Sequence, residues 1–366
     1  MPTRNLHLEP FDSGTLTKLE IFESYAQAWL PTWIMSSTKR ISIVDFFAGT
    51  GYDKDGNPGS PIRLLRQIDN FFDNCIEKGT KIRLHLNEFD PEKFKSLNDA
   101  FEEWRAQHPR INRIVEIIPH NKDFKQLFPI LKTEIQQNPS LVYLDQNGVK
   151  FIGSKYLLEF EKMKATDFLA FTSSSFLYRL GDQDEFQKHV RINLARLRES
   201  GYSHTHRMLC TQLKELLPGN TDLKLYPFSI KKKGQIYGII FGSSHPRGVD
   251  KFLNLAWKEN AINGEANFDM DEDLQKSQLS FFEDKKLTKI QSFEKNVEHA
   301  VLAKKIRNNR TLLEFAFENG HKGTHAAKVL RELKKQGKIT YEGKSPRVTY
   351  KAVYKDQYVV RYEVMK

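Results

Sequence analysis

The sequence has few of the features that mark exported, membrane-spanning or metal-cluster proteins. Only two cysteines, Cys75 and Cys210, occur among 366 residues, too few for a disulfide framework or a protein-bound metal cluster. No run of about 20 apolar residues is present, and residues 1–10 lack the charged-then-apolar pattern of a signal peptide. We therefore expect a cytoplasmic chain with reduced cysteines, no membrane partner and no metal site.

Acidic residues are scarce in one region. The chain carries a formal net charge of +11, and residues 301–366 hold 16 Lys and Arg against 6 Asp and Glu. Almost all of the excess positive charge therefore belongs to the C-terminal segment. Such a concentration favours nucleic acid as a partner for that segment. A basic, solvated surface without a partner is the alternative.

Helix and strand patterns alternate through the first half of the chain. An amphipathic helix over 16–33 precedes a short buried strand at 41–44, and a Gly-rich loop follows that strand. Ser60 is a plausible N-cap for the next helix. Further strands are predicted at 81–90, 113–119, 141–145 and 166–173, with helices at 61–78, 91–108, 123–137 and 154–164. This alternation predicts an α/β fold with a doubly wound, mostly parallel sheet.

The second half departs from this alternation. Residues 186–217 are predicted to be mainly helical, and 224–229 with 235–241 to form an antiparallel hairpin on the sheet. Residues 259–273 lack periodicity and are interpreted as a linker or exposed loop. Two helices at 312–318 and 324–336, the second capped by Thr324, and two strands within 338–354 resemble a winged helix. The predicted domains are 1–258, a linker and helix at 259–300, and a basic winged-helix-like domain at 301–366.

Polar side chains follow each of the first four predicted strands. Asp45 ends the first strand, before Gly49 and Gly51, where a Cβ would keep a ligand from the backbone. Because the carboxyl ends of parallel strands share one edge of a sheet, these side chains are predicted to form one site. The later strands contribute Glu88 and Asp90, then Asn121 and Asp123, then Asp145, Gln146, Asn147 and Gly148.

The second strand end is the most informative about the ligand. An acid at this place, here Glu88, can accept hydrogen bonds from both ribose hydroxyls of a bound nucleoside. Asp123 is then placed to accept from an adenine amino group. The alternative for Glu88 is an ordinary solvent-facing strand end.

These residues resemble a known family. Residues 44–51, VDFFAGTG, are similar to the first motif of S-adenosylmethionine-dependent methyltransferases, and the wider pattern resembles the three-Cys-motif partner proteins of bacteria. The matching pieces are Thr17-Lys18 with Tyr25 and Trp29, residues 45–51, 59–61 and 141–145, and residues 244–248 with Trp257.

The resemblance, which covers roughly residues 10–260, implies a Rossmann-like methyltransferase fold and a partner that carries a three-cysteine, radical-enzyme-like cluster. The S-adenosylmethionine site that we expect comprises Asp45, Phe47, Ala48, Gly49, Gly51, Glu88, Asn121 and Asp123, with Asp145, Gln146 and Asn147 as the catalytic residues that meet the acceptor.

The fourth strand end departs from the family pattern. Amino-group methyltransferases acting on nucleic acids carry Asp-Pro-Pro-Tyr or Asn-Pro-Pro-Tyr there, and the partner proteins an Asp-Pro-x-Gly pattern. Residues 145–148 are Asp-Gln-Asn-Gly, without a proline. Asp145 can still accept a proton or orient a nucleophile. The clamp that would hold a flipped base is not evident.

Basic residues outside the strand ends indicate contacts with phosphate. Lys328, Arg331 and Lys335 share one face of a predicted helix, as a groove-reading or phosphate-tracking helix requires. Arg247, in Ser-His-Pro-Arg-Gly, is a further candidate.

The sequence thus predicts a methyltransferase-like protein acting on or with DNA or RNA. One alternative is a non-catalytic nucleotide- or nucleic-acid-binding partner or sensor in a bacterial defence system, such as one directed against phage. A transcriptional regulator is a third option.

Overall fold

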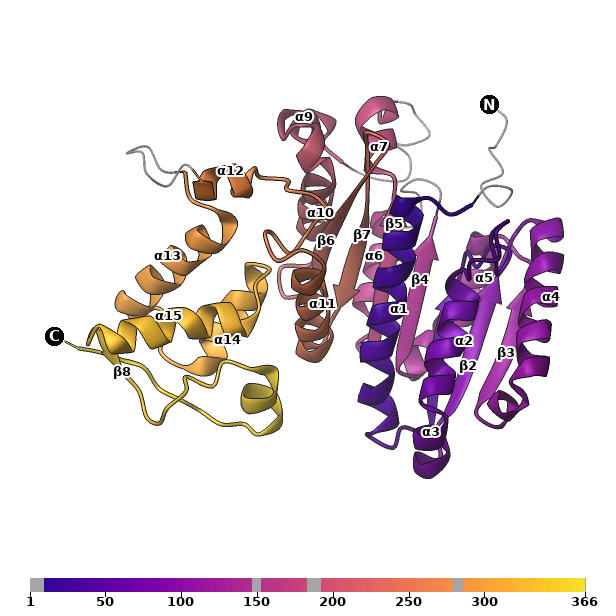
Figure 1. Cartoon of the computed structure of the whole chain (residues 1–366), viewed down its shortest axis with the longest axis horizontal. Coiled ribbons are helices and arrows are strands. Elements are labelled where there is room, and N and C mark those ends of the chain that lie inside the picture. The colour runs from indigo at the N-terminus through magenta and orange to yellow at the C-terminus, as the bar shows by residue number, and fades with distance from the viewer. Residues whose placement is uncertain (1–9, 147–152, 183–191, 279–285, 366) are drawn as a thin grey trace. The chain divides into compact units, whose positions relative to one another are not determined.

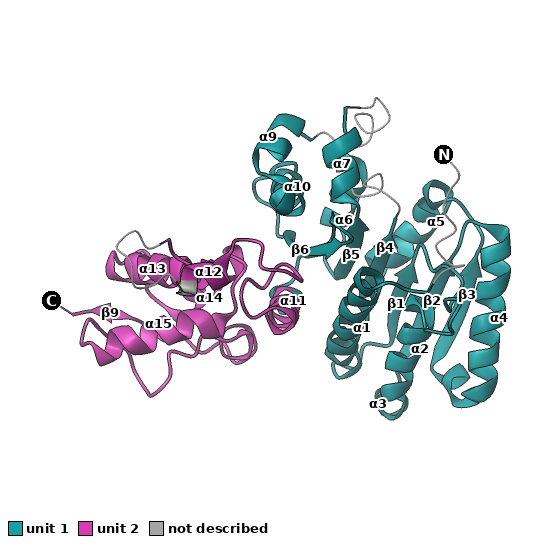
Figure 2. Ribbon diagram, turned by 45° about the horizontal axis from the view of Figure 1, so that its top comes forward, with its two compact units in different colours: residues 1–248 teal, residues 249–366 magenta. Residues whose placement is uncertain are grey.

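The computed structural model describes residues 10–146, 153–182, 192–278 and 286–365. The chain forms two compact units, residues 1–248 (unit 1) and 249–366 (unit 2), shown in teal and magenta in Figure 2. The division lies within helix α11 (Pro246–Glu259), before the predicted domain boundary at residue 258.

Unit 1 is built on a seven-stranded sheet with the strand order β3-β2-β1-β4-β5-β7-β6. Strands β1 to β5 pair in parallel, and β7 is antiparallel to both β5 and β6. The strands are β1 (Arg40–Asp45), β2 (Lys81–Asn87), β3 (Val115–His120), β4 (Ser140–Asp145), β5 (Thr166–Thr172), β6 (Lys224–Lys232) and β7 (Gln235–Ser243). This is the doubly wound α/β arrangement with an added hairpin that the sequence predicts.

Helices cover both faces of this sheet (Figure 1). One face carries α1 (Ser13–Ile34), α2 (Ser60–Asn70), α3 (Phe72–Lys78) and α4 (Pro91–Gln107), and the other carries α5 (Phe124–Gln137), α6 (Ser154–Glu161), α7 (Ser174–Leu180), α9 (Leu194–Glu199) and α10 (Thr205–Glu215). Two 3-10 turns, Pro109–Arg113 and Tyr202–His204, also occur in the described part of unit 1.

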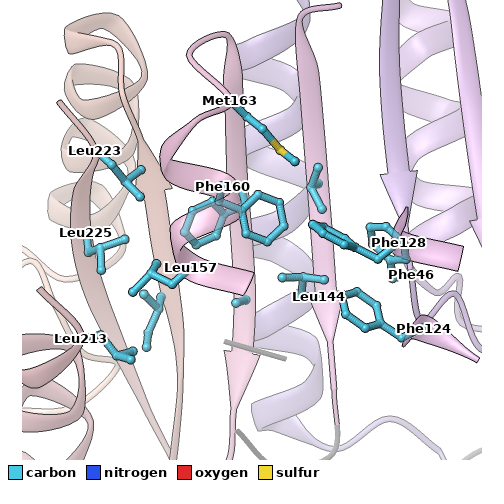
Figure 3. Packing of buried hydrophobic residues seen from close by; sticks show 14 of the residues in the cluster. Phe46, Phe124, Phe128, Leu144, Leu157, Phe160, Met163, Leu213, Leu223 and Leu225 are labelled. Carbon is cyan, nitrogen blue, oxygen red and sulfur yellow. The ribbon is translucent and has the colours of Figure 1, made fainter. Parts of the chain in front are cut away.

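The second face buries a continuous apolar cluster (Figure 3). Phe46, directly after β1, packs edge-on against Phe124 of α5 at 4.8 Å between ring centroids. Phe160 of α6 lies against Phe168 of β5 at 4.8 Å. Full burial of such side chains contributes about 1.5–3 kcal/mol each. The strand ends near Phe46 are therefore held on a rigid layer.

The start of α2 differs from the prediction. Gly59, not Ser60, occupies the N-cap position, and Ser60 is the first helical residue. Its hydroxyl donates to Asp45 instead of capping the helix. The predicted helix at 61–78 is also two helices, with a non-helical backbone at Phe71 (φ −105°) between them. This break turns Phe72 and Cys75 inward, where both are buried.

The hairpin of β6 and β7 is confirmed. Lys233 and Gly234 at its turn both have positive φ, 47° and 76°. Two consecutive residues with positive φ form the tight turn whose twist matches that of paired strands. Because β7 runs antiparallel to β5, its last residue, Ser243, pairs with Asp167 near the start of β5.

Unit 2 contains a winged helix-turn-helix. Its elements are α12 (Asp273–Gln278), α13 (Lys289–Leu302), α14 (Asn309–Glu318), α15 (Gly323–Lys335), β8 (Ile339–Thr340) and β9 (Glu363–Val364). Helix α15 packs on both α13 and α14.

Two details of the winged helix correct the prediction. Lys322, rather than Thr324, is the N-cap residue of α15. The second wing strand is β9, which lies beyond the range 338–354 in which both strands are predicted, and residues Lys351–Lys355, at the end of that range, form a helical turn. Ala352 and Val353 are both buried there. Neighbouring residues of a strand point to opposite faces, so a helical turn buries this pair more readily.

The segment interpreted as a linker is packed. Asn263 is fully buried and donates to the carbonyl of Phe268 at 2.8 Å, and Asn260 donates to the carbonyl of Ala266 at 2.8 Å. The polar residues that indicated a loop therefore bond the backbone of that segment to itself.

Candidate functional site

The predicted site lies where the strand order reverses. The chain continues from β1 to β2 and β3 on one side, then returns to place β4 and β5 on the other. Ligands of open α/β sheets bind outside the carboxyl ends of the strands at such a switch point. Asp45 and Asp145 end the two strands that flank it, β1 and β4. We call the edge where β1 to β5 end the carboxyl edge.

Asp45 is a fully buried acid at the switch point. Its carboxylate accepts hydrogen bonds from the Ser60 hydroxyl at 2.6 Å and the Phe47 amide at 3.1 Å. Burial, with a smaller contribution from the Asp145 carboxylate, raises the pKa of the Asp45 carboxyl to about 7, although the two hydrogen bonds and the Lys18 ammonium oppose the rise. Near neutral pH this carboxyl can therefore hold or release a proton.

Asp145 forms an ion pair with Lys18 of α1. Lys18 is only 7% exposed, and its ammonium also lies 4.8 Å from the centroid of the Phe171 ring. The Asp145 side chain retains 25% exposure. A cation and a carboxylate from distant parts of the sequence thus meet at the predicted acceptor position.

Glu88 is attached to the Gly-rich loop. One oxygen of its carboxylate accepts from the Gly49 amide at 3.1 Å, and the other accepts from the Asp90 amide at 2.9 Å. Asn121 donates to the backbone carbonyls of Glu88 and Phe89 at 2.7 and 2.9 Å. The ends of strands β2 and β3 are therefore connected to the loop after β1 by the hydrogen bonds of Glu88 and Asn121. Because each carboxylate oxygen has two lone pairs, Glu88 retains acceptor capacity for a ligand.

Gly51 has a role that differs from the expected one. Its φ is +87°, and a Cβ there would lie 2.6 Å from the Cβ of Ala100 in α4. The absence of a side chain at this position therefore serves the contact between loop and helix, and its carbonyl accepts from the Gly59 amide at 2.8 Å. Gly49 also has positive φ, 67°.

The remaining predicted cofactor residues lie at the same edge. Asp123 is half-buried and caps α5, accepting from the Lys125 amide at 2.8 Å. The Phe47 ring stacks on Phe124 at 5.9 Å between centroids. The Ala48 amide donates to the carbonyl of Asn87 at 2.8 Å. These contacts order the loop, and the predicted cofactor roles stay predictions.

Two of the predicted site residues are not placed at this edge by the described structure. Asn147 lies outside the described residues, whereas its neighbour Gln146 is described and buried. Arg247 follows β7, whose last residue pairs with the start of β5, so it lies at the opposite edge of the sheet. A role for Arg247 beside the cofactor is therefore excluded by strand direction, and its predicted phosphate contact would belong to another surface.

The three cations predicted on α15 are all exposed. Lys328 forms an ion pair with Glu294 of α13 at 2.7 Å, whereas no ion pair to Arg331 or Lys335 occurs in the described part of unit 2. The helix thus presents cations on one face, as the sequence predicts. Glu294 reduces the charge available at one of them.

The sequence reasoning missed Lys18 and Ser60 as partners of the two central acids. A signal for Lys18 was present, because it precedes Phe22, Tyr25 and Trp29 at helical spacings of four, seven and eleven. A lysine within an apolar stripe must find a buried partner or extend to water. The position of Ser60 gave no such signal, because a serine before a helix usually caps it.

A model of a known domain family matches part of unit 2. Residues 267–346 match the family model of the GMT-like wHTH domain, in agreement with the winged helix described above. None of the curated proteins compared with the chain matches it.

Two solved structures resemble the chain at a distance. "Crystal Structure of SCL7 in Oryza sativa" is 11% identical with a TM-score of 0.30, and covers 63% of this chain and 82% of its own. "Crystal structure of DszA carbon methyltransferase" is 11% identical with a TM-score of 0.30, and covers 56% of this chain and 48% of its own. Likenesses this low carry no argument. The strand order and directions of unit 1 by themselves establish the doubly wound α/β fold.

Two features are absent from the described residues. No helix among them is both long and apolar enough to cross a bilayer. No group of three or more potential ligands gathers there to hold a metal ion.

Proposed function

We propose that this protein is an S-adenosylmethionine-dependent methyltransferase that acts on nucleic acid. The observation that carries the proposal is the placement of Asp45 and Asp145 on the two strands that flank the switch point, with Glu88, after the neighbouring strand β2, bonded to the Gly49 amide of the loop after β1. Acids on successive strands suit a ligand that combines ribose hydroxyls with positive charge.

The residues present fit such a cofactor. Glu88 has acceptor capacity for ribose hydroxyls and Asp123 for the adenine amino group, and the loop at Gly49, which Asp45 holds through the Phe47 amide, would contact the methionine portion. Bound S-adenosylmethionine would supply an electrophilic methyl group. The chain would position the acceptor in line with it and keep water out, which are the main sources of rate in such a displacement.

Glu88→Gln is expected to weaken binding of S-adenosylmethionine more than tenfold. The amide keeps one acceptor oxygen for the loop but loses the charge and one acceptor for the ribose. Calorimetry with the full chain measures this change. Glu92→Gln, an exposed acid in the first turn of α4, is the matched control and should change affinity less than twofold. Equal affinities for wild type and Glu88→Gln would rule out the ribose role.

The basic winged helix is proposed to bring the nucleic acid. Replacing both Arg331 and Lys335 by Ala is expected to weaken binding and to reduce the slope of log K against log salt by about 1.8 for duplex DNA or about 1.4 for single strands. Fluorescence anisotropy at several salt concentrations measures the slope. Lys295→Ala, an exposed cation on α13, is the control. An unchanged slope in the double variant would remove α15 from the interface.

The resemblance to three-Cys-motif partner proteins supports a partner that carries the cluster. Cys75 and Cys210 are both buried, and burial raises the pKa of the Cys75 thiol to about 11, which disfavours the thiolate that ligates metals. We propose that cluster chemistry belongs to that second protein.

A non-catalytic partner or sensor is the second candidate. The Lys18–Asp145 ion pair favours it, because an acid already neutralised by a lysine is a poor partner for an amino-group acceptor. Incubation of the chain with methyl-labelled S-adenosylmethionine, the partner and mixed nucleic acids distinguishes the two. Label in nucleic acid supports the enzyme, and binding without transfer supports the sensor.

A further inference from the structure

The Lys18–Asp145 ion pair indicates which atom would accept the methyl group. It lies at the end of β4, where the sequence predicts the acceptor, and the lysine is almost fully buried. A buried ion pair contributes little to stability, because the desolvation of its charges offsets their attraction. A chemical role therefore explains the presence of the ion pair at this edge better than a contribution to stability does.

The two classes of acceptor respond oppositely to an ammonium group beside them. An exocyclic amino nitrogen gains positive charge as a methyl group adds to it, so a neighbouring lysine cation raises the barrier. A hydroxyl oxygen must lose its proton and gains negative charge as it attacks. A cation then stabilises the oxygen, and a carboxylate can take the proton. The pair matches a hydroxyl acceptor.

We propose that the acceptor is the 2′-hydroxyl of a ribose in RNA, an inference that rests on the proposed function. The Lys18 ammonium donates to the attacking oxygen, and the Asp145 carboxylate accepts its proton. The new bond joins that oxygen to the methyl carbon. The carbon–sulfur bond of the sulfonium donor breaks with its electron pair going to sulfur, which leaves a neutral thioether. Only RNA carries this hydroxyl, so the chemistry selects RNA over DNA.

A second feature of the same edge agrees with a polar acceptor. Ser173 directly follows β5, two residues after the Phe171 ring that lies near Lys18. It is 6% exposed, and its hydroxyl makes no hydrogen bond within the described residues. A buried hydroxyl without a partner is costly. A ribose brings hydroxyl groups that can satisfy it.

The first experiment incubates the full chain with methyl-labelled S-adenosylmethionine and either total RNA or DNA. Nucleosides released by digestion are identified by mass spectrometry, and 2′-O-methyl nucleosides from RNA alone are the expected result. An RNA oligonucleotide with deoxyribose at the modified position should accept no label. Methyl groups on base nitrogens, or equal transfer to DNA, would overturn the proposal.

Variants of the ion pair test the roles of its members. Lys18→Met and Asp145→Asn are each expected to lower methyl transfer at least a hundredfold, and Lys18→Arg, which keeps the cation, to recover at least tenfold over Lys18→Met. The double variant Lys18→Met/Asp145→Asn avoids a buried unpaired charge and should be as inactive as either single variant. Lys224→Met, an exposed lysine at the opposite edge, is the control and should keep full activity.

Calorimetry with S-adenosylmethionine separates loss of chemistry from loss of folding. The variants are expected to bind the cofactor within threefold of wild type. If the double variant binds the cofactor and still methylates RNA at the wild-type rate, the proposal is wrong. If wild type binds the cofactor but transfers no methyl group to ribose, only the proposal of a ribose hydroxyl as acceptor is wrong. If wild type does not bind it, the proposed function fails as well.

Discussion

Asp45→Asn is expected to stabilise unit 1 at pH 8 while weakening its affinity for S-adenosylmethionine. The asparagine keeps both local hydrogen bonds, because its oxygen can accept from the Phe47 amide and its NH₂ group can donate to the Ser60 hydroxyl. It removes only the buried charge. A substitution that improves stability and impairs binding would mark Asp45 as a residue retained for its function.

The pH dependence follows from the raised pKa of Asp45. The folded chain keeps this proton up to about pH 7, whereas the unfolded chain releases it near 3.8. Between these values the folded state binds more protons, so stability falls as pH rises. The loss of stability caused by ionised Asp45 is complete above pH 7. Three pKa units at about 1.4 kcal/mol each make this loss on the order of 4 kcal/mol. Below pH 4 the charge costs nothing.

Urea unfolding at pH 4 and pH 8 measures this difference. The free energy of unfolding of Asp45→Asn should exceed that of wild type at pH 8 and approach it at pH 4. Asp55→Asn, on the exposed loop after β1, is the control and should change stability at neither pH. A variant less stable than wild type at pH 8 would show that the ionised carboxylate is stabilised by Lys18 more than burial penalises it.

Gly51→Ala is expected to destabilise unit 1 by about 3 kcal/mol or more. The backbone at φ +87° is strained for any residue with a Cβ, at about 1–3 kcal/mol. The new methyl group would also meet the Cβ of Ala100 at 2.6 Å, and overpacking of this kind costs about 1–3 kcal/mol. The loop that holds Gly49 against Glu88 should shift with it.

The double variant Gly51→Ala/Ala100→Gly separates these two causes. Ala100→Gly alone should cost about 1 kcal/mol, because glycine lowers helix propensity. Combined with Gly51→Ala it removes the clash but leaves the strained φ, so the double variant should be more stable than the sum of the single changes predicts. Urea unfolding of all four proteins measures this coupling. Strict additivity would place the whole effect in the backbone angle.

The main elements of the fold were predictable because each carries a local signal. Residues 41–44 are mostly β-branched, and Pro91 follows the capping Asp90, so β1 and the start of α4 could be located. The break at Phe71 and the helical turn at 351–355 were not, because burial of Phe72 and of Ala352 with Val353 decided them. Local patterns contain no information about which distant element buries a side chain.

The candidate site, like the fold, was predictable from the sequence only in part. The sequence by itself determined that Asp45, Glu88, Asp123 and Asp145 follow successive strands, because alternation with helices is visible in hydrophobic periodicity. Only the tertiary structure decided that Lys18 pairs with Asp145, that Ser60 bonds Asp45 and that Arg247 lies at the opposite edge. These outcomes depend on strand direction and on helix packing, which no local pattern specifies; Lys18 and Asp145, for example, are 127 residues apart in the sequence.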